Sequence, residues 1–190
     1  MNLASSHDLR RAKWLGQSSI IRRAQFAGRD NLLEVDAIAA KLAAGDPRVL
    51  AIAAGREVLR RTRDYLQSGD NFAIETTLSG VWAVRAMNEA ARRGYFVRLI
   101  YICLDNAERC IQRVGERVAQ GGHSVPEGDV RRRYARSLSN VKQVLKSVDQ
   151  ALLYDNSGPE PQLVLEMRAG AVLSRAGNMP GWVLNASIIR

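Results

Sequence analysis

The chain has 190 residues, of which 46% are hydrophobic and 25% charged, as expected for one globular domain. No apolar run approaches the roughly 18 residues that span a bilayer, and the first residues lack the apolar core of a signal peptide. We therefore expect no membrane partner and a cytoplasmic location. The net charge of +9 favours an anionic partner, such as a phosphorylated small molecule or an acidic protein. Nucleic acid is a weaker candidate, because basic and aromatic residues do not alternate as in RNA-reading modules.

The first third of the chain predicts three helices and one short strand. Residues 1–30 contain no convincing strand, but loosely helical spacing predicts a helix over Ser18–Gln25. The apolar run Leu32–Val35 predicts a strand. Ala37–Ala44 is predicted as a helix, and Pro47–Ser68 as a longer amphipathic helix, because proline is tolerated in a first helical turn.

The middle of the chain carries the strongest strand signal. Phe72–Ile74 predicts a strand that ends in a carboxylate and two hydroxyls, and Val81–Arg93 predicts the helix that follows. Tyr95–Leu104 is apolar at nearly every position, which is typical of a parallel strand covered on both faces. Asn106–Gln120 predicts a helix, and the capping-box spacing of Ser124–Glu127 predicts the start of another.

The last part of the chain completes the alternation of strands and helices. Ser139–Ser147 predicts a further helix and Ala151–Tyr154 a strand. Gln162–Met167 and Ala171–Arg175 predict a hairpin, and Pro180 predicts the start of a short helix. Such alternation predicts an α/β fold with a largely parallel sheet flanked by helices.

Polar side chains follow two of the predicted strands, and arginines gather on the later helices. Asp36 follows one strand, and Glu75 and Thr77 follow the next, where ligands bind in α/β sheets. The stretch 113–136 adds arginines on both sides of a Gly-Gly turn. Phosphoryl transfer needs such a set, with a base for the attacking hydroxyl and positive charge around the transferred group. Helix capping is the simpler alternative for Asp36 and for Thr76 or Thr77.

The order and spacing of these segments resemble the zeta-toxin-like P-loop kinases, from about Asn31 to Gly158. The motifs that carry the resemblance are Val35-Asp36, Ile74-Glu-Thr-Thr-Leu-Ser-Gly80, Arg113-Val-Gly-Glu-Arg-Val-Ala-Gln-Gly-Gly-His-Ser-Val-Pro126, Arg131-Arg-Arg-Tyr-Ala-Arg-Ser137 and Tyr154-Asp-Asn-Ser-Gly158. The resemblance implies a P-loop NTPase-like fold, with one kinase domain over residues 31–190 after a degenerate phosphate-loop region, residues 1–30. It also implies ATP and magnesium as cofactors, a substrate hydroxyl that is phosphorylated, such as that of a UDP-sugar, and a small antitoxin partner.

The same resemblance assigns roles to individual residues. Asp36 looks like the carboxylate that accepts the proton of the substrate hydroxyl. Glu75 and Thr77 look like substrate contacts. Arg117 and Arg132 look like lid arginines that contact the ATP phosphates. The other residues expected to bind the nucleotide are Gly16, Gln17, Ser18, Ser19, Arg113 and Arg133.

The sequence departs from the family pattern at its phosphate loop, which should read Gly-x-x-x-x-Gly-Lys-Ser/Thr after a buried strand. Gly16 and Ser18 hold their places, with Ser18 as the expected magnesium ligand, but Gln17 stands where lysine should be. Asn2–Arg10 is too polar to form the usual first central strand. Ser79 stands near where toxin members place a substrate-contacting arginine, which leaves the sugar-nucleotide substrate open. The alternative is therefore an inactive relative with a binding or regulatory role, and nucleic-acid binding through the arginine-rich face is a weaker one.

The cysteines and histidines do not form a metal-binding pattern. Cys103 and Cys110 are expected to be small buried residues, one in a strand and one in a helix. His7 and His123 are far apart in the chain, so no set of metal ligands is expected. His123 is interpreted as a turn residue.

Overall fold

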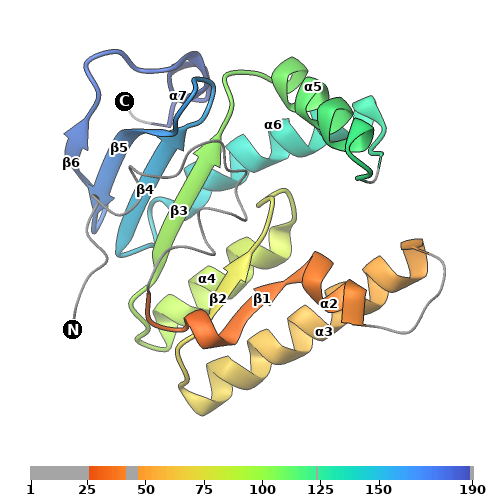
Figure 1. Ribbon diagram of the computed structural model, residues 1–190. Coiled ribbons are helices and arrows are strands. Elements are labelled where there is room, and N and C mark those ends of the chain that lie inside the picture. The colour runs from red at the N-terminus through yellow and green to blue at the C-terminus, as the bar shows by residue number, and fades with distance from the viewer. Residues whose placement is uncertain (1–25, 42–46, 123, 189–190) are drawn as a thin grey trace. The chain divides into compact units, whose positions relative to one another are not determined.

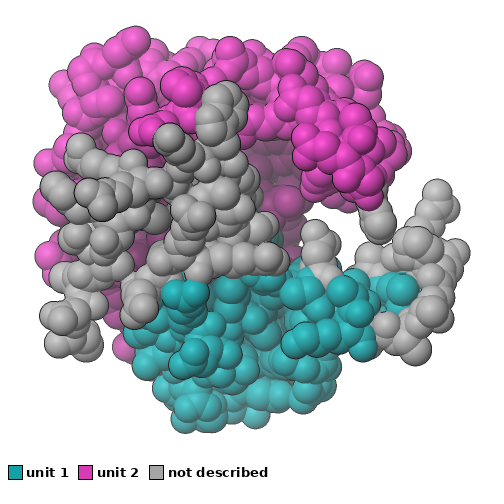
Figure 2. All heavy atoms as spheres, viewed as in Figure 1, with its two compact units in different colours: residues 1–76 teal, residues 77–190 magenta. Residues whose placement is uncertain are grey.

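The computed structural model describes residues 26–41, 47–122 and 124–188 (Figure 1). The chain divides into two compact units, residues 1–76 and residues 77–190, which Figure 2 colours separately. The helix predicted over Ser18–Gln25 lies outside the described residues. The predicted boundary between a phosphate-loop region and a kinase domain at residue 30 stays a prediction.

The first unit contains a parallel pair of strands whose connection runs through two helices. Its elements are η2 (Arg29–Asn31), β1 (Leu32–Glu34), α2 (Val35–Lys41), α3 (Pro47–Ser68) and β2 (Ala73–Glu75). Leu33 lies opposite Ile74 and Glu34 lies opposite Glu75 in the parallel register. The predicted elements are confirmed with small shifts, because Val35 begins α2 instead of ending β1.

Helix α3 buries a single stripe of side chains four residues apart. This stripe consists of Ala54, Val58, Thr62 and Leu66. The Thr62 hydroxyl donates a hydrogen bond of 2.7 Å to the Val58 carbonyl, which satisfies it inside the core. Among the apolar positions that predicted this amphipathic helix, Val49, Ile52 and Leu59 are instead 62%, 59% and 41% exposed. A surface helix buries only one stripe, so apolar residues outside it stay in water.

Gly28 holds a backbone conformation that a larger residue adopts only with strain. Its φ is 87°, and a Cβ there would lie 2.5 Å from the backbone nitrogen of Phe72. We expect Gly28→Ala to destabilise the first unit by about 2 kcal/mol or more, because the neighbour is backbone and cannot rotate away. Gly55→Ala in α3 is the matched control, since nothing lies within 4 Å of its added Cβ.

The control has the opposite expected sign. Alanine loses less backbone entropy than glycine on entering a helix, so Gly55→Ala should stabilise the protein by about 0.5–1 kcal/mol. Denaturant unfolding followed by circular dichroism measures both variants. Equal midpoints for the two variants would show that the close approach at Gly28 is not a constraint.

The second unit contains a four-stranded sheet with helices. Its elements are α4 (Val81–Arg92), β3 (Arg98–Cys103), α5 (Ala107–Ala119), α6 (Glu127–Val144), β4 (Gln150–Asp155), β5 (Gln162–Arg168), β6 (Ala171–Arg175) and α7 (Gly181–Asn185). The strand order is β3-β4-β5-β6. β3 and β4 are parallel, whereas β4 with β5 and β5 with β6 are antiparallel.

The protein is therefore a mixed α/β protein whose described strands form two hydrogen-bonded sheets. The prediction of a largely parallel sheet is correct for β1 with β2 and for β3 with β4, but not for the β5–β6 hairpin that ends the second sheet. Within the described residues, β3 has a strand partner along one edge only. None of the described helices is long and apolar enough to span a bilayer.

The core of the second unit lies around the middle of its sheet. Leu153 on β4 lies opposite Tyr101 on β3 and Leu165 on β5, and both leucines are fully buried. Trp182 of α7 is also buried, and its ring lies 5.8 Å from that of Tyr101. Side chains of β3 alternate between half-buried and buried. One face of the strand is therefore covered more deeply than the other, whereas the uniform apolar run predicted two equally covered faces.

Most helix ends of the second unit were predicted correctly. Asn106 caps α5 by accepting a hydrogen bond from the Arg109 backbone nitrogen. Gly94 and Gly121 have φ values of 82° and 89°, the left-handed conformation that ends helices. The predicted hairpin and the short helix after Pro180 are also confirmed.

The prediction for α6 was wrong in two respects. Its N-cap is Pro126, which makes no side-chain cap, so the capping box expected at Ser124 does not form. The helix expected to start near Ser139 is instead the second half of α6, which runs unbroken to Val144. No glycine or proline lies between Arg136 and Ser139, so nothing in the local sequence stops the helix.

Candidate functional site

Carboxylates mark the carboxyl ends of the two parallel strands in the first unit. Glu34 and Glu75 lie opposite each other in register, so their side chains leave the sheet on the same face, and both are half-buried. Asp36 is the second residue of α2, two positions after β1 ends. The strand pairing thus brings Glu34 and the predicted site residue Glu75 to one edge of one sheet, and Asp36 follows Glu34 by two residues along the chain.

Glu34 was missed by the sequence prediction. The sequence could have indicated Glu34, because this polar residue follows the apolar Leu33, which is buried, and ends the strand that precedes Asp36. The strand was expected to continue to Val35, which made Asp36 look like its only terminal carboxylate. Only the register with Glu75 shows that Glu34 belongs to the same edge.

The segment after β2 makes a tight, anchored turn. Thr77 is exposed, and its hydroxyl lies 2.9 Å from that of Ser79. Leu78 is buried at a positive φ of 54°, and its carbonyl accepts a 2.8 Å hydrogen bond from the buried Asn140 amide. Gly80, rather than a threonine, occupies the N-cap position of α4. The turn therefore exposes Thr77 at a fixed place in the second unit.

Arginines of α5 bind the turn that follows β4. Arg113 donates a 2.7 Å hydrogen bond to the Asn156 carbonyl, and Arg109 donates to the carbonyl of Ser157. Arg117 lies exposed in the last turn of α5, where its carbonyl accepts a 2.9 Å hydrogen bond from the Gly122 backbone. Two of the family-like motifs are therefore in direct contact through Arg113, which uses part of its donor capacity for structure.

The three successive arginines of α6 point to different surroundings. Arg131 forms an ion pair with Glu108 of α5. Arg132 donates a 2.6 Å hydrogen bond to Asp129 one turn earlier. Arg133 is exposed and has no hydrogen-bond or ion-pair partner within the described ranges. This agrees with the rotation of about 100° between neighbouring helical residues, which prevents all three from facing one ligand.

Asp105 is a further carboxylate at a strand end that the sequence prediction did not select. It lies two residues after β3, and its backbone N–H donates a 2.8 Å hydrogen bond to the Ser157 hydroxyl. Its Oδ1 atom is buried and accepts no hydrogen bond from the described residues, although the Arg109 Nε atom lies 3.4 Å away. Arg109 therefore compensates the charge of the Asp105 side chain, which is 38% exposed as a whole.

The cysteines lack the properties of nucleophiles. Cys103 is buried in β3, as predicted, and burial raises the pKa of its thiol to about 12. Cys110 is half-buried in α5, and burial raises its thiol pKa as well. Both thiols therefore stay protonated near neutral pH. The described part of the chain contains no group of three His, Cys, Asp or Glu side chains placed to hold a metal ion.

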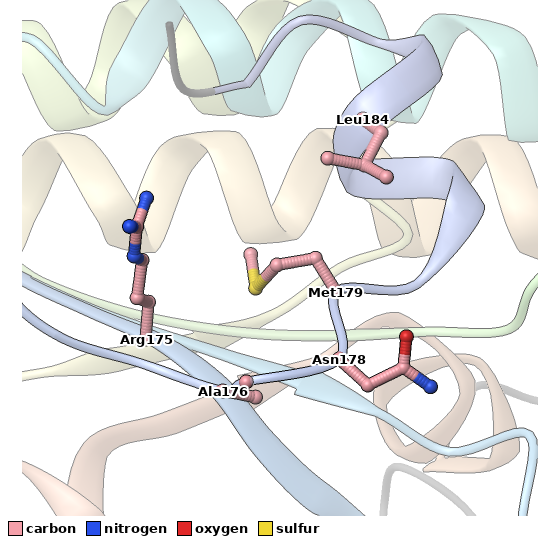
Figure 3. A pocket seen from close by; sticks show the side chains of 6 residues that line it. Arg175, Ala176, Asn178, Met179 and Leu184 are labelled. Carbon is pink, nitrogen blue, oxygen red and sulfur yellow. The ribbon is translucent and has the colours of Figure 1, made fainter.

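Two open hollows lie on the described surface. One, of about 490 Å³, lies where the chain passes from β6 to α7 (Figure 3), and it is lined by Arg175, Ala176, Gly177, Asn178, Met179 and Leu184. None of its lining residues was predicted to be functional. The other, of about 560 Å³, lies among β1, α2 and α3 of the first unit. Glu34 lines it, together with the cationic side chains of Lys41, Arg56, Arg60 and Arg61.

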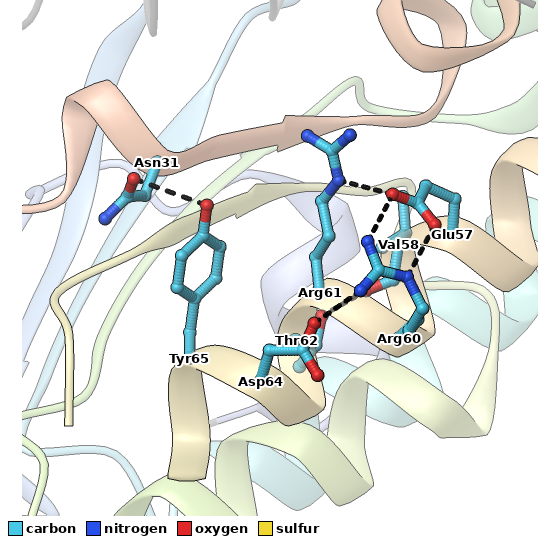
Figure 4. Close-up of polar contacts among 8 residues, drawn as sticks. All are labelled: Asn31, Glu57, Val58, Arg60, Arg61, Thr62, Asp64 and Tyr65. Atoms are coloured by element: carbon cyan, nitrogen blue, oxygen red, sulfur yellow. Dashed lines mark hydrogen bonds and ion pairs between the residues drawn. The ribbon is translucent and has the colours of Figure 1, made fainter. Parts of the chain in front are cut away.

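Polar contacts along α3 fix some of the side chains that line this second hollow (Figure 4). Glu57 accepts hydrogen bonds of 2.8 Å from Arg60 and 2.6 Å from Arg61, and Arg60 also donates to Asp64 at 2.7 Å. Further along the helix, the Tyr65 hydroxyl donates to the Asn31 side chain at 3.3 Å. The two arginines are therefore held in place by one carboxylate.

We expect this contact to make stability depend on pH in the acid range. Hydrogen bonds from Arg60 and then Arg61 lower the pKa of Glu57 from its ordinary 4.5 to about 2. Because the folded-state pKa is the lower one, the stabilisation is present above about pH 4.5 and is lost as the pH falls towards 2. The melting temperatures of wild type and Glu57→Gln should therefore differ above pH 5 and converge near pH 2. A difference that stays constant over this range would contradict the assignment.

The predicted nucleotide-loop residues lie outside the described residues. These are Gly16, Gln17, Ser18 and Ser19, and the same holds for His123. The predictions for them, including the magnesium ligand Ser18, stay predictions.

Comparison with known proteins gives one informative relative. Over 103 residues the chain is 32% identical to an uncharacterized protein of Haemophilus influenzae. The aligned part covers 54% of this chain and 74% of that protein. No family model matches the chain, and no solved structure matches it.

Proposed function

Because the chain belongs to the same protein family as the uncharacterized protein of Haemophilus influenzae, we propose a function from its own residues: an ATP-dependent small-molecule kinase of the zeta-toxin type. The observation that carries the proposal is the register of β1 and β2, which sets Glu34 opposite Glu75 at the carboxyl ends of both strands, two residues before Asp36 in the chain. In α/β proteins, this is the end of a parallel sheet where ligands bind. A P-loop NTPase-like fold is part of the same proposal.

The carboxylates of the first unit serve the acceptor substrate. As the substrate hydroxyl attacks the γ-phosphorus, Asp36 accepts its proton, a new P–O bond forms, and the bond to the ADP leaving group breaks. The resemblance assigns substrate contacts to Glu75 in this unit and to Thr77 in the other. Ser79 is neutral, so it cannot pair with a substrate diphosphate as an arginine would. The proposal therefore specifies only that the substrate carries a hydroxyl group, which both a UDP-sugar and a smaller alcohol do.

The arginines of the second unit serve the phosphates. When bound, ATP supplies the phosphoryl group that is transferred. Arg117 and Arg132 contribute positive charge that stabilises the developing negative charge. Arg132 donates to Asp129 through only one of its nitrogens, so further N–H groups remain for a phosphate. The resemblance also assigns phosphate contacts to Gly16, Gln17, Ser18, Ser19, Arg113 and Arg133. By analogy with the family, Ser18 and an acidic residue would hold Mg²⁺.

Calorimetric titration with ATP in the presence of Mg²⁺ tests the proposal. We expect binding by the wild type and a loss of affinity in the double variant Arg117→Gln/Arg132→Gln. Arg63→Gln is the control, because Arg63 is an exposed arginine of α3 with no partner in the described part of the chain. An absence of heat with wild-type protein would refute the kinase proposal.

A second candidate is an inactive relative that binds but does not phosphorylate. Gln17 favours it, because glutamine brings no charge to the β- and γ-phosphates where the phosphate-loop pattern has lysine. Gln17→Lys separates the two candidates. A large gain in ATP affinity or turnover supports an impaired phosphate loop, whereas unchanged affinity shows that this segment does not bind phosphate.

A further inference from the structure

Helix α6 presents one face that is cationic along its whole second half. At 100° per residue, six residues of α6 fall within about 120° of arc: Arg132, Ala135, Arg136, Ser139, Lys142 and Gln143. Lys146 follows them in the turn after the helix. All of them are exposed. The opposite face carries the buried Val130, Ser137 and Val141, which fix the orientation of the helix. We call the exposed side the α6 cationic face.

Three cations on this face have no partner among the described residues. Within the described residues, no carboxylate lies at ion-pair distance from Arg136, Lys142 or Lys146, whereas Arg132 is paired with Asp129. The carboxylates of α6 itself, Glu127 and Asp129, are confined to its first turn. The described carboxylates therefore do not compensate the positive charge of the second half of this face.

The continuity of α6 is what aligns these cations. A chain break near Ser139, which the sequence predicted, would turn Lys142 and Lys146 away from Arg136. In the unbroken helix, Arg136 and Lys142 lie about 9 Å apart along the axis, at 1.5 Å per residue, and Lys146 follows in the turn after the helix. Nucleic acid carries one phosphate per about 3.4 Å of axis on each strand, so this row of cations can contact several phosphates at once.

The residues of the α6 cationic face suit nucleic acid better than they suit a membrane surface or an acidic protein. A helix that binds a membrane surface needs large apolar residues beside its cations, and the exposed large apolar side chains of the described chain include none from α6. A stable protein interface needs aromatic or aliphatic anchors at its centre, and this face offers only Ala135. Short polar and basic side chains suit a phosphate backbone.

We propose that the α6 cationic face binds the phosphodiester backbone of nucleic acid without reading its base sequence. Arg136, Lys142 and Lys146 are the contacts. The face has no aromatic side chain for base stacking and no Asn–Arg set aimed at base edges, so affinity comes from charge and is independent of sequence. The chain's net charge of +9 draws the polymer towards the protein.

Fluorescence anisotropy with the full-length protein tests this proposal. Labelled duplex DNA and single-stranded RNA, each of about 20 nucleotides per strand, are titrated at about 50 to 200 mM salt. We expect binding that weakens steeply with salt. In the triple variant Arg136→Gln/Lys142→Gln/Lys146→Gln, the slope of log K against log salt should shrink by about 2.7 for DNA, or about 2.1 for RNA, as three phosphate contacts are lost.

The control removes the same charge elsewhere in the second unit. Arg85→Gln/Arg168→Gln/Arg175→Gln changes three exposed arginines of α4, β5 and β6 and should leave the slope near the wild-type value. If the α6 variant changes the salt slope more for one polymer, DNA or RNA, that polymer is the preferred ligand of the α6 cationic face. Equal losses in both variants, no binding at about 50 mM salt, or binding only to anionic lipid vesicles would overturn the proposal. None of the six residues belongs to the proposed kinase site.

Discussion

Replacing Asp36 with asparagine is expected to lower the rate of phosphate transfer from ATP to a substrate hydroxyl by about 10²- to 10⁴-fold. The asparagine amide has nearly the same shape, but it cannot accept the proton that the attacking hydroxyl loses. ATP affinity should change little, because Asp36 acts on the acceptor. Formation of ADP in the presence of a hydroxyl substrate, with UDP-N-acetylglucosamine as the first compound tested, measures the effect.

Asp30→Asn provides the matched control for this substitution. Asp30 is an exposed carboxylate of η2 in the same unit. Its replacement removes the same charge as Asp36→Asn but changes no residue of the proposed site. Its rate should equal that of the wild type. If Asp36→Asn also keeps the wild-type rate while ATP turnover is measurable, Asp36 is a helix residue and another carboxylate, such as Glu34 or Glu75, is the base.

Leu153→Ala is expected to destabilise the second unit by about 2–5 kcal/mol. Leu153 is fully buried in β4 between Tyr101 of β3 and Leu165 of β5, so its removal opens a cavity that both neighbouring strands line. The cost combines the lost transfer free energy of the side chain with the cavity that remains. Denaturant unfolding monitored by circular dichroism gives the difference in unfolding free energy.

Leu173→Ala in β6 separates burial from strand propensity. Leu173 is 58% exposed, so its truncation should change the unfolding free energy by no more than about 0.5 kcal/mol. Similar losses for the two variants would mean that β6 is covered in solution, for example by another molecule. A small loss for Leu153→Ala alone would contradict the position of the core.

The local sequence predicted most of the secondary structure, because its signals act over a few residues. Pro47 at the start of α3, Asn106 before α5, and the glycines at 94 and 121 gave correct helix ends. One error arose where a matching local signal was not used by the fold. Ser124 matched a capping box, yet Pro126 became the N-cap.

The candidate site could be predicted only as a set of separate segments. Asp36, Glu75 and Thr77 stand out because polar residues end apolar runs. Glu34 was missed, because its position matters only through Glu75, which lies opposite it in the strand pair. Likewise, the use of Arg113 to bind the Asn156 carbonyl cannot be inferred from the spacing of arginines.

By itself, the sequence determined the number and order of most elements, the net positive charge, and the strand ends where polar groups gather, since these depend on composition and short-range periodicity. The tertiary structure alone decided which residues become neighbours. It set Glu34 opposite Glu75, ended the second sheet with an antiparallel hairpin, and joined two expected helices into α6. Register and helix continuity depend on contacts between residues far apart in the chain, because burial of one face against a partner outweighs weak local preferences.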